Sequence, residues 1–152
     1  MEATSAMEGS LLDKLVGEVR RYNNKAFLKA AMAVCALTAA ADDEVSLAEH
    51  YRIDEIIAKD PALKELNAQK AIDTLYDYIY ALRTYGESAK EVLYNKVERM
   101  AGDHKKSRTL MRVAYLVIIA DQEIRDAERE EFRRLCGVLG LKPEQVWREL
   151  AD

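Results

Sequence analysis

The sequence has little of what most non-helical folds require. Its 152 residues include only two prolines, six glycines and two cysteines. So few turn-forming residues leave little room for a fold built from many short strands. There is no C-x-x-C pair and no disulfide framework. Cys35 and Cys136 both lie within apolar helical patterns, so we expect buried, reduced thiols.

The sequence also lacks a long apolar segment and an excess of basic residues. Its longest apolar runs, 30–41 and 113–120, are too short to span a bilayer, so we expect no membrane insertion. With 23 basic and 27 acidic side chains the net charge is −4, which gives no general electrostatic footprint for nucleic acid. Residues 1–9 indicate a disordered tail without the features of a signal peptide. We therefore expect a cytoplasmic protein with a single all-helical domain over residues 10–152.

What the sequence does contain is helical periodicity along nearly its whole length. Apolar residues recur at spacings of three and four, and no segment clearly alternates like a half-buried strand. The pattern predicts an all-α fold, a compact bundle of seven or eight helices. We expect them near residues 11–22, 24–41, 47–59, 67–85, 88–101, 103–120, 130–139 and 143–150. The second is apolar nearly all round in its latter half, which is typical of a buried helix.

Individual residues mark several of the expected helix ends. Ser88 and Glu91 fit a capping box at the start of one helix, and Asp103 is expected to begin the next. Gly140 fits the position after a helix end, and Pro143 fits the first turn of the last helix.

Tyrosine is abundant, and four tyrosines share the helix expected near 67–85: Tyr76, Tyr78, Tyr80 and Tyr85. Packing against the core is the favoured interpretation, and an aromatic groove for a partner is the alternative.

An acidic segment occurs twice with a constant shift of 79 residues. ADDEVSLAE, residues 41–49, and ADQEIRDAE, residues 120–128, are identical at five of nine positions. Each follows a nearly uncharged apolar helix and precedes an amphipathic one. Core positions also coincide under the shift: Val34 with Val113, Leu37 with Leu116, Ile53 with Phe132, Ile56 with Leu135, and Ile57 with Cys136. The repeating unit is therefore helix–acidic loop–helix, and we expect the two units to be related by a pseudo-two-fold axis.

The acids in these segments occupy positions of different electrostatic character. Asp42 and Asp121 follow the C-terminal ends of helices, where the helix dipole and unpaired carbonyl groups make an acid unfavourable unless a cation binds. Glu49 and Glu128 lie seven residues later, in the first turn of the next helix, where the dipole favours an acid. Ser46 and Glu49 fit a capping box, but no serine stands at the equivalent position before Glu128, which argues against capping as the shared role.

We expect a metal site formed by the acids that both segments share. Glu44 and Glu123 are also shared, but they lie in mid-loop, and whether they act as ligands stays open. Asp43 and Asp126 have no acidic counterpart and are left out of a symmetric site. Ligands that are all oxygen favour Ca²⁺, Mg²⁺ or Mn²⁺, with Zn²⁺ as a further option. The predicted metal ligands are Asp42, Glu49, Asp121 and Glu128.

Two stretches carry a family resemblance. They are RYNNKAFLKAAMAVCALTAAADDEVSLAE at 21–49, with an R-Y-x-N-K-x-F entry before its apolar helix, and its echo MRVAYLVIIADQEIRDAEREEF at 111–132. Through them the chain resembles the TerB-like tellurite-resistance family, over roughly residues 15–150. Where the family loop often has Asp-Gly, this chain has Asp42-Asp43 and Asp121-Gln122.

The resemblance implies an all-α fold with helix pairs about an internal pseudo-two-fold axis. It implies an acidic surface patch regarded as a metal site, which maps to Asp42, Glu49, Asp121 and Glu128. It also implies a role in resistance to tellurite and other stresses, together with membrane-bound and cytosolic protein partners from the same gene cluster.

Two functions are consistent with these patterns, and enzyme activity is not expected. The first is a non-enzymatic divalent-cation-binding module of a stress-response system. The second is a helical interaction scaffold whose acidic patch docks a basic partner without metal. The sequence has no placed histidine base, nucleophile elbow, phosphate loop or cofactor fingerprint, which argues against a hydrolase. The oligomeric state and the number of ions stay open.

Overall fold

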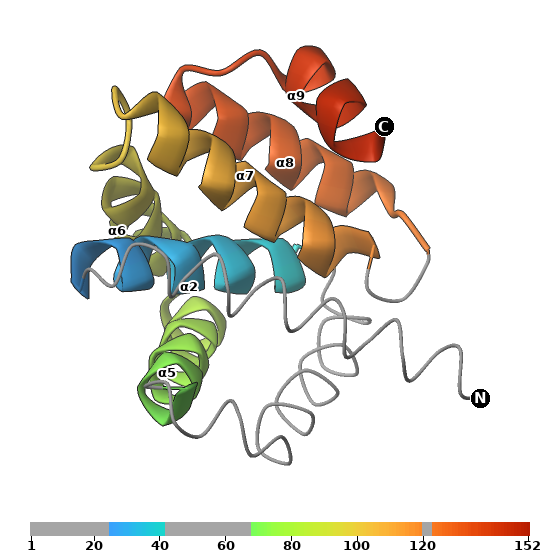
Figure 1. The fold of residues 1–152 in the computed structure, drawn as a ribbon. Coiled ribbons are helices and arrows are strands. Elements are labelled where there is room, and N and C mark those ends of the chain that lie inside the picture. The colour runs from blue at the N-terminus through green and yellow to red at the C-terminus, as the bar shows by residue number, and fades with distance from the viewer. Residues whose placement is uncertain (1–24, 42–67, 120–122) are drawn as a thin grey trace.

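The computed structural model of the chain describes residues 25–41, 68–119 and 123–152 (Figure 1). These residues form helices and contain no strand, which confirms the all-α prediction. The six described helices are α2 (Lys25–Ala39), α5 (Ala68–Tyr85), α6 (Glu87–Glu98), α7 (His104–Ile118), α8 (Asp126–Leu139) and α9 (Pro143–Ala151). The tail predicted at 1–9 and the helices predicted near 11–22 and 47–59 lie outside the described residues.

Helix α2 is the centre of the described structure. Every residue from Ala30 to Ala39 is buried, as the apolar pattern predicts. The helix contacts α5, α6, α7 and α8, and in Figure 1 it lies between α5 on one side and the pair α7 and α8 on the other. Five of those ten residues are alanines, whose small side chains allow neighbouring helices to approach closely on several sides.

The turn between α5 and α6 depends on Gly86. This residue has a φ of 58°, a left-handed conformation that glycine adopts without steric cost, and α5 ends before it as predicted. Helix α6 then begins at Glu87, earlier than expected, with no side-chain cap. The Ser88 hydroxyl donates a hydrogen bond to the carbonyl oxygen of Tyr85 at 3.1 Å. The predicted capping box of Ser88 and Glu91 is therefore wrong, because the glycine turn starts the helix before it.

Other predicted helix ends are confirmed. The Asp103 side chain accepts a hydrogen bond from the backbone N–H of Lys106 at 3.0 Å and caps α7. Gly140 follows α8 with a φ of 73°, and Pro143 is the first residue of α9. Helix α8 begins at Asp126, which puts Glu128 in its first turn as expected and extends the helix four residues before the stretch 130–139.

Helix α9 is attached through Trp147. Its ring makes edge-to-face contacts with Tyr115 of α7, at 5.1 Å between centroids, and with Phe132 of α8, at 4.9 Å. The guanidinium of Arg129 lies over the same indole ring at 5.0 Å, a cation–π geometry. These contacts hold three helices together around one aromatic side chain.

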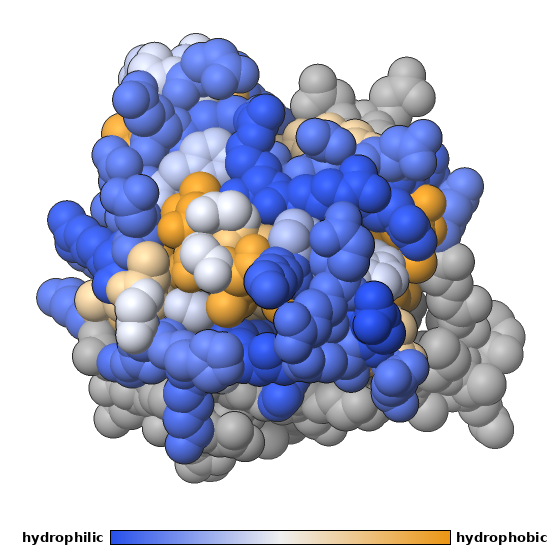
Figure 2. Space-filling model, turned by 90° about the horizontal axis from the view of Figure 1, so that it is seen from above, coloured by the Kyte–Doolittle hydropathy of each residue, from blue (hydrophilic) through white to orange (hydrophobic). Residues whose placement is uncertain are grey.

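The face seen in Figure 2 is mostly hydrophilic, with smaller hydrophobic areas between charged side chains.

The tyrosines of α5 only partly follow the core-packing interpretation. Tyr78 is half-buried and packs against the core, and Tyr76 is half-buried as well. Tyr80 and Tyr85 are 67% and 65% exposed, so core packing is the wrong interpretation for these two.

The described half of the sequence repeat has matching helix bounds. Helix α2 runs from Lys25 to Ala39, and the same bounds shifted by 79 residues are those of α7, His104 to Ile118. Two core pairs of the repeat are buried in these helices: Val34 with Val113, and Leu37 with Leu116. Residues 47–59, the partner helix of the first unit, lie outside the described residues, so the pseudo-two-fold axis stays a prediction.

Candidate functional site

The two acidic segments continue from helix ends that lie on one side of the structure. Helices α2 and α7 contact each other, and in Figure 1 both end on the right of the view. Asp42 and Asp121 each follow the last residue of their helix by three positions. Asp42, Glu49 and Asp121 themselves lie outside the described residues. Glu128 is the one predicted ligand whose surroundings are described.

Glu128 caps helix α8. Its side chain is almost fully buried, and its Oε1 accepts a hydrogen bond from the backbone N–H of Arg125 at 3.1 Å. From the sequence, the lack of a serine at position 125 argued against capping. The hydrogen bond to Glu128 shows that this argument does not hold. This half of a capping box needs only the glutamate and the backbone N–H of the N-cap residue. The cap also explains why α8 starts at Asp126 rather than near 130.

An ionised carboxylate can accept several hydrogen bonds on its two oxygens, and the cap on α8 is one use of the Glu128 carboxylate. Burial of a carboxylate is costly unless its charge is compensated by hydrogen bonds, the helix dipole or a cation. A cap and a metal ligand are therefore compatible roles for this side chain.

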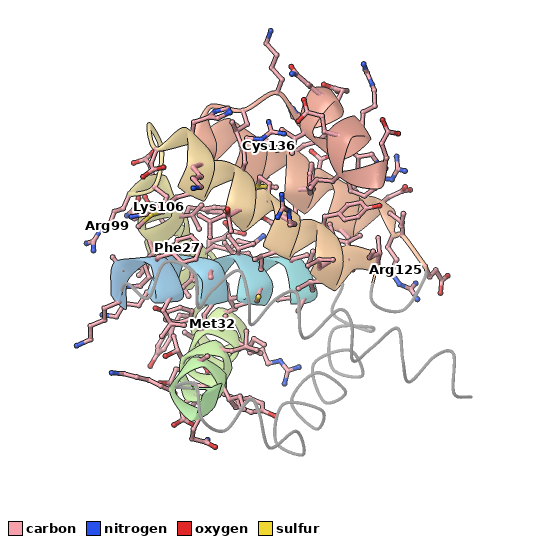
Figure 3. All side chains as sticks on the ribbon, viewed as in Figure 1. Phe27, Met32, Arg99, Lys106, Arg125 and Cys136 are labelled. Carbon is pink, nitrogen blue, oxygen red and sulfur yellow. The ribbon has the colours of Figure 1, made fainter. Side chains whose placement is uncertain are left out.

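Glu123 is exposed and forms an ion pair, whereas Glu128 is buried. Its side chain is 67% exposed, and its Oε2 lies 3.1 Å from an Nη atom of Arg125 in an ion pair. A carboxylate that faces a guanidinium must exchange that partner before it binds a metal ion. Figure 3 shows Arg125 at the same side of the structure, next to the start of α8. Its sequence counterpart Glu44 lies outside the described residues.

Thr38 contributes an oxygen near the end of α2. Its side chain is fully buried, and its hydroxyl makes no hydrogen bond to any described residue. A threonine in a helix commonly bonds the carbonyl four residues earlier, and a buried hydroxyl without any partner costs about 1–3 kcal/mol. An orphaned polar atom of this kind is a place where a water molecule or an ion is expected.

The cysteines are confirmed as buried thiols. Cys35 of α2 and Cys136 of α8 are both free and buried. Burial raises the pKa of each thiol to about 12, so neither is a thiolate at neutral pH. Figure 3 shows Cys136 within the helical layer of α7 and α8. Across the described ranges, no group of three or more His, Cys, Asp or Glu side chains is placed to hold a metal ion.

Tyr94 and Glu131 form a hydrogen-bonded pair between α6 and α8 that the sequence analysis missed. Glu131 is 5% exposed, and the Tyr94 hydroxyl donates a hydrogen bond to its Oε2. Burial raises the pKa of Glu131 above its usual value, and burial together with the Glu131 hydrogen bond raises the pKa of Tyr94. A hydrogen bond with Tyr94 raises the pKa of Arg134. The available signal was the position of Glu131, next to Phe132 and three residues after Glu128 on the inward face of α8.

Together the fold and the site define an all-helical module in which two similar helices each lead into an acidic segment. None of the described helices is both long and apolar enough to cross a membrane. The family model of the tellurite resistance protein TerB matches residues 28–149. The chain therefore belongs to the TerB family. No curated protein and no solved structure was found to match it.

Proposed function

We propose that this TerB-family chain is a non-enzymatic module that binds a divalent cation in a stress-response system. The proposed ligands are Asp42, Glu49, Asp121 and Glu128. The observation that carries the proposal is the buried carboxylate of Glu128, which lies at the start of α8, immediately after the segment that follows α7. Membership of the family supports the link to tellurite resistance.

The helix ends explain why a cation would be favoured there. The last carbonyl groups of α2 and α7 lack intrahelical partners, and the helix dipole places partial negative charge at the same ends. Asp42 and Asp121 add full negative charges within one turn of Ala39 and Ile118. A cation held between these groups would remove the repulsion. The orphaned hydroxyl of Thr38 is a further oxygen at the end of α2.

The donor set determines the kind of ion and the kind of activity. Carboxylate, carbonyl and hydroxyl oxygens suit the hard cations Ca²⁺, Mg²⁺ and Mn²⁺. The ion would join the two acidic segments. A protein partner of the stress-response system would then recognise the ion-bound form of the module. No turnover is proposed, because the sequence offers no placed histidine base, nucleophile elbow, phosphate loop or cofactor fingerprint.

A second candidate is a scaffold whose acidic patch docks a basic partner without metal. The ion pair between Glu123 and Arg125 favours it, since one carboxylate of the segment already accepts an arginine. The two candidates predict different dependence on metal and salt. Binding of a basic partner would weaken with ionic strength and would not change when metal is removed.

Calorimetric titration of metal-stripped protein with Ca²⁺, Mg²⁺, Mn²⁺ and Zn²⁺ tests the proposal. Asp42→Asn and Asp121→Asn should each abolish or weaken binding. Asp126→Asn is the matched control, because this acid lies in the second acidic segment but has leucine as its repeat counterpart. Thermal melts of the same samples should show about 2.7 kcal/mol of added stability at about a hundred times the dissociation constant.

The outcomes separate the two candidates. Binding that is lost in either Asp42→Asn or Asp121→Asn but kept in Asp126→Asn supports one shared ion. A halved stoichiometry in each variant supports one ion in each segment. Absence of binding below about millimolar concentration, with both variants at least as stable as the wild type, would reject the metal and favour the scaffold.

A further inference from the structure

Positive charge is concentrated in one stretch of this acidic protein. Between Lys96 and Arg112 there are six basic and two acidic residues, a net charge of +4 in a chain whose total is −4. The stretch covers the end of α6, the connection to α7 and the first half of α7. The remaining residues therefore carry −8, so the molecule has a strongly uneven charge distribution.

The fold adds the start of α2 to this region. Helix α2 contacts both α6 and α7, and in Figure 1 α2 and α7 begin on the same side of the molecule. Figure 3 shows Arg99 and Lys106 at that side, with Arg99 directed away from the helices. The side opposite to the C-terminal ends of α2 and α7 is therefore basic. This basic end consists of Lys25, Lys29, Arg99, Lys105 and Lys106.

These lysines oppose the preference of the helices that carry them. A helix N-terminus carries partial positive charge, so acidic residues stabilise the first turn and basic residues destabilise it. Neither α2 nor α7 has an acidic residue in its first turn, whereas Lys25, Lys105 and Lys106 lie there. Only the Asp103 cap offsets the charge at α7. Stability of the fold therefore does not account for these cations, and a docked anionic group would relieve their repulsion.

Two of the cations are available to a partner. Arg99 and Lys105 are exposed, and neither forms an ion pair with a described residue. Arg108 differs, because it pairs with Glu149 of α9. Lys96 lies over the ring of Tyr78 at 5.9 Å. Within the basic end, Arg99 and Lys105 are therefore the cations through which a partner is best tested.

We propose that the basic end docks an acidic segment of a partner protein. The cations come from two packed helices and the end of a third, and helix axes in contact are about 8–10 Å apart. This spread exceeds a single small anion and suits a chain of carboxylates. An anionic membrane is less suitable, since the large exposed apolar side chains among the described residues lie elsewhere: Tyr80, Tyr85, Val92 and Ile124. No exposed aromatic lies within the stretch to stack a nucleic-acid base.

The test uses a fluorescein-labelled peptide of twelve glutamates and the full-length protein. Fluorescence anisotropy should show binding at about 0.1 M ionic strength and loss of binding at about 1 M, as the Debye length falls from about 10 Å to about 3 Å. Arg99→Glu combined with Lys105→Glu should weaken binding by about tenfold or more. The matched control is Lys70→Glu combined with Lys142→Glu, which makes the same change in net charge at exposed sites outside the basic end.

Other outcomes would overturn the proposal. An equal loss in the control variant would mean that net charge alone attracts the peptide. Binding of phosphatidylserine vesicles or of a DNA duplex, but not of the peptide, would assign the basic end to a membrane or to nucleic acid. A wild-type dimer that the Arg99→Glu and Lys105→Glu changes dissociate would make a second copy of the chain the occupant. Circular dichroism and melting of each variant establish that it is folded.

Discussion

Two substitutions separate the hydrogen bond that Glu128 accepts as a helix cap from the negative charge that it carries. Glu128→Gln keeps an oxygen that accepts the backbone N–H of Arg125, because glutamine serves in a capping box as glutamate does. It removes the negative charge that a metal site and the helix dipole would use. Glu128→Ala removes both the acceptor and the charge, and it leaves the N–H of Arg125 without this partner.

The structure sets the expected magnitudes. A lost hydrogen bond that leaves a buried donor unsatisfied costs about 1–3 kcal/mol, so Glu128→Ala should destabilise the protein by about 2 kcal/mol. Loss of the charge at a helix N-terminus costs about 0.3–1 kcal/mol, so Glu128→Gln should cost about 0.5 kcal/mol. With about 2–4 °C per kcal/mol for a chain of this size, the melting temperature should fall by about 4–8 °C and about 1–2 °C respectively.

Thermal melts in chelator and in saturating Mn²⁺ or Ca²⁺ separate the two roles. In chelator the hydrogen bond and the helix dipole contribute but a metal ion does not, so the glutamine variant should stay within about 0.5 kcal/mol of the wild type. With metal, the wild type should gain stability and Glu128→Gln should not, because an amide is a poor replacement for an anionic ligand. Glu130→Gln and Glu130→Ala are the controls, since this exposed residue of α8 makes only a surface ion pair.

Two results would refute this reasoning. If Glu128→Gln and Glu128→Ala are equally destabilised in chelator, the charge rather than the hydrogen bond supports α8. If Glu128→Gln keeps the full gain from metal, Glu128 is a cap and not a ligand.

Further predictions concern the packing of α8. Glu131→Gln keeps an acceptor for the Tyr94 hydroxyl but cannot ionise. Burial raises the pKa of Glu131 above 4.5, so the folded wild type binds the proton of this carboxyl more tightly than the unfolded chain does. The stability of the wild type therefore falls as pH rises through the folded-state pKa. Urea unfolding from acidic to neutral pH should show Glu131→Gln gaining on the wild type as pH rises; a constant difference would contradict the assignment. Leu135→Ala should cost about 2–5 kcal/mol because its side chain is fully buried, while Val92→Ala, at a half-exposed site, should cost less than about 0.5 kcal/mol.

The sequence predicted the helical framework well because its signals are local and strong. The apolar run 30–41 predicted the buried part of α2, and Gly86, Gly140 and Pro143 marked real helix ends. The error at Ser88 came from two competing local signals. A capping pattern and a glycine stop lie two residues apart, and the left-handed Gly86 set where α6 begins. Only the tertiary structure decides such a competition.

The candidate site was less accessible to sequence reasoning. The repeat pointed to Glu128, and the structure adds that it is buried and caps α8. The absence of a serine misled the interpretation, because the backbone N–H that Glu128 binds carries no sequence signal. Glu131 was missed since its partner Tyr94 lies 37 residues earlier on another helix. A pairing over that distance cannot be inferred from one sequence.

The opposed charges at both ends of α7 lead to a final prediction. Lys105 lies in its first turn and Asp121 follows its last residue by three positions, so each charge opposes the helix dipole. A helix of 15 residues is about 22 Å long, and effects at such separated sites add. Lys105→Glu combined with Asp121→Asn should therefore raise the stability in chelator by about 1–2 kcal/mol. The same protein should lose metal binding and should bind the acidic peptide more weakly than the wild type. A variant less stable than the wild type would show that these charges serve the fold, whereas a more stable and inactive one would show that they are kept for ligands at opposite ends of one helix.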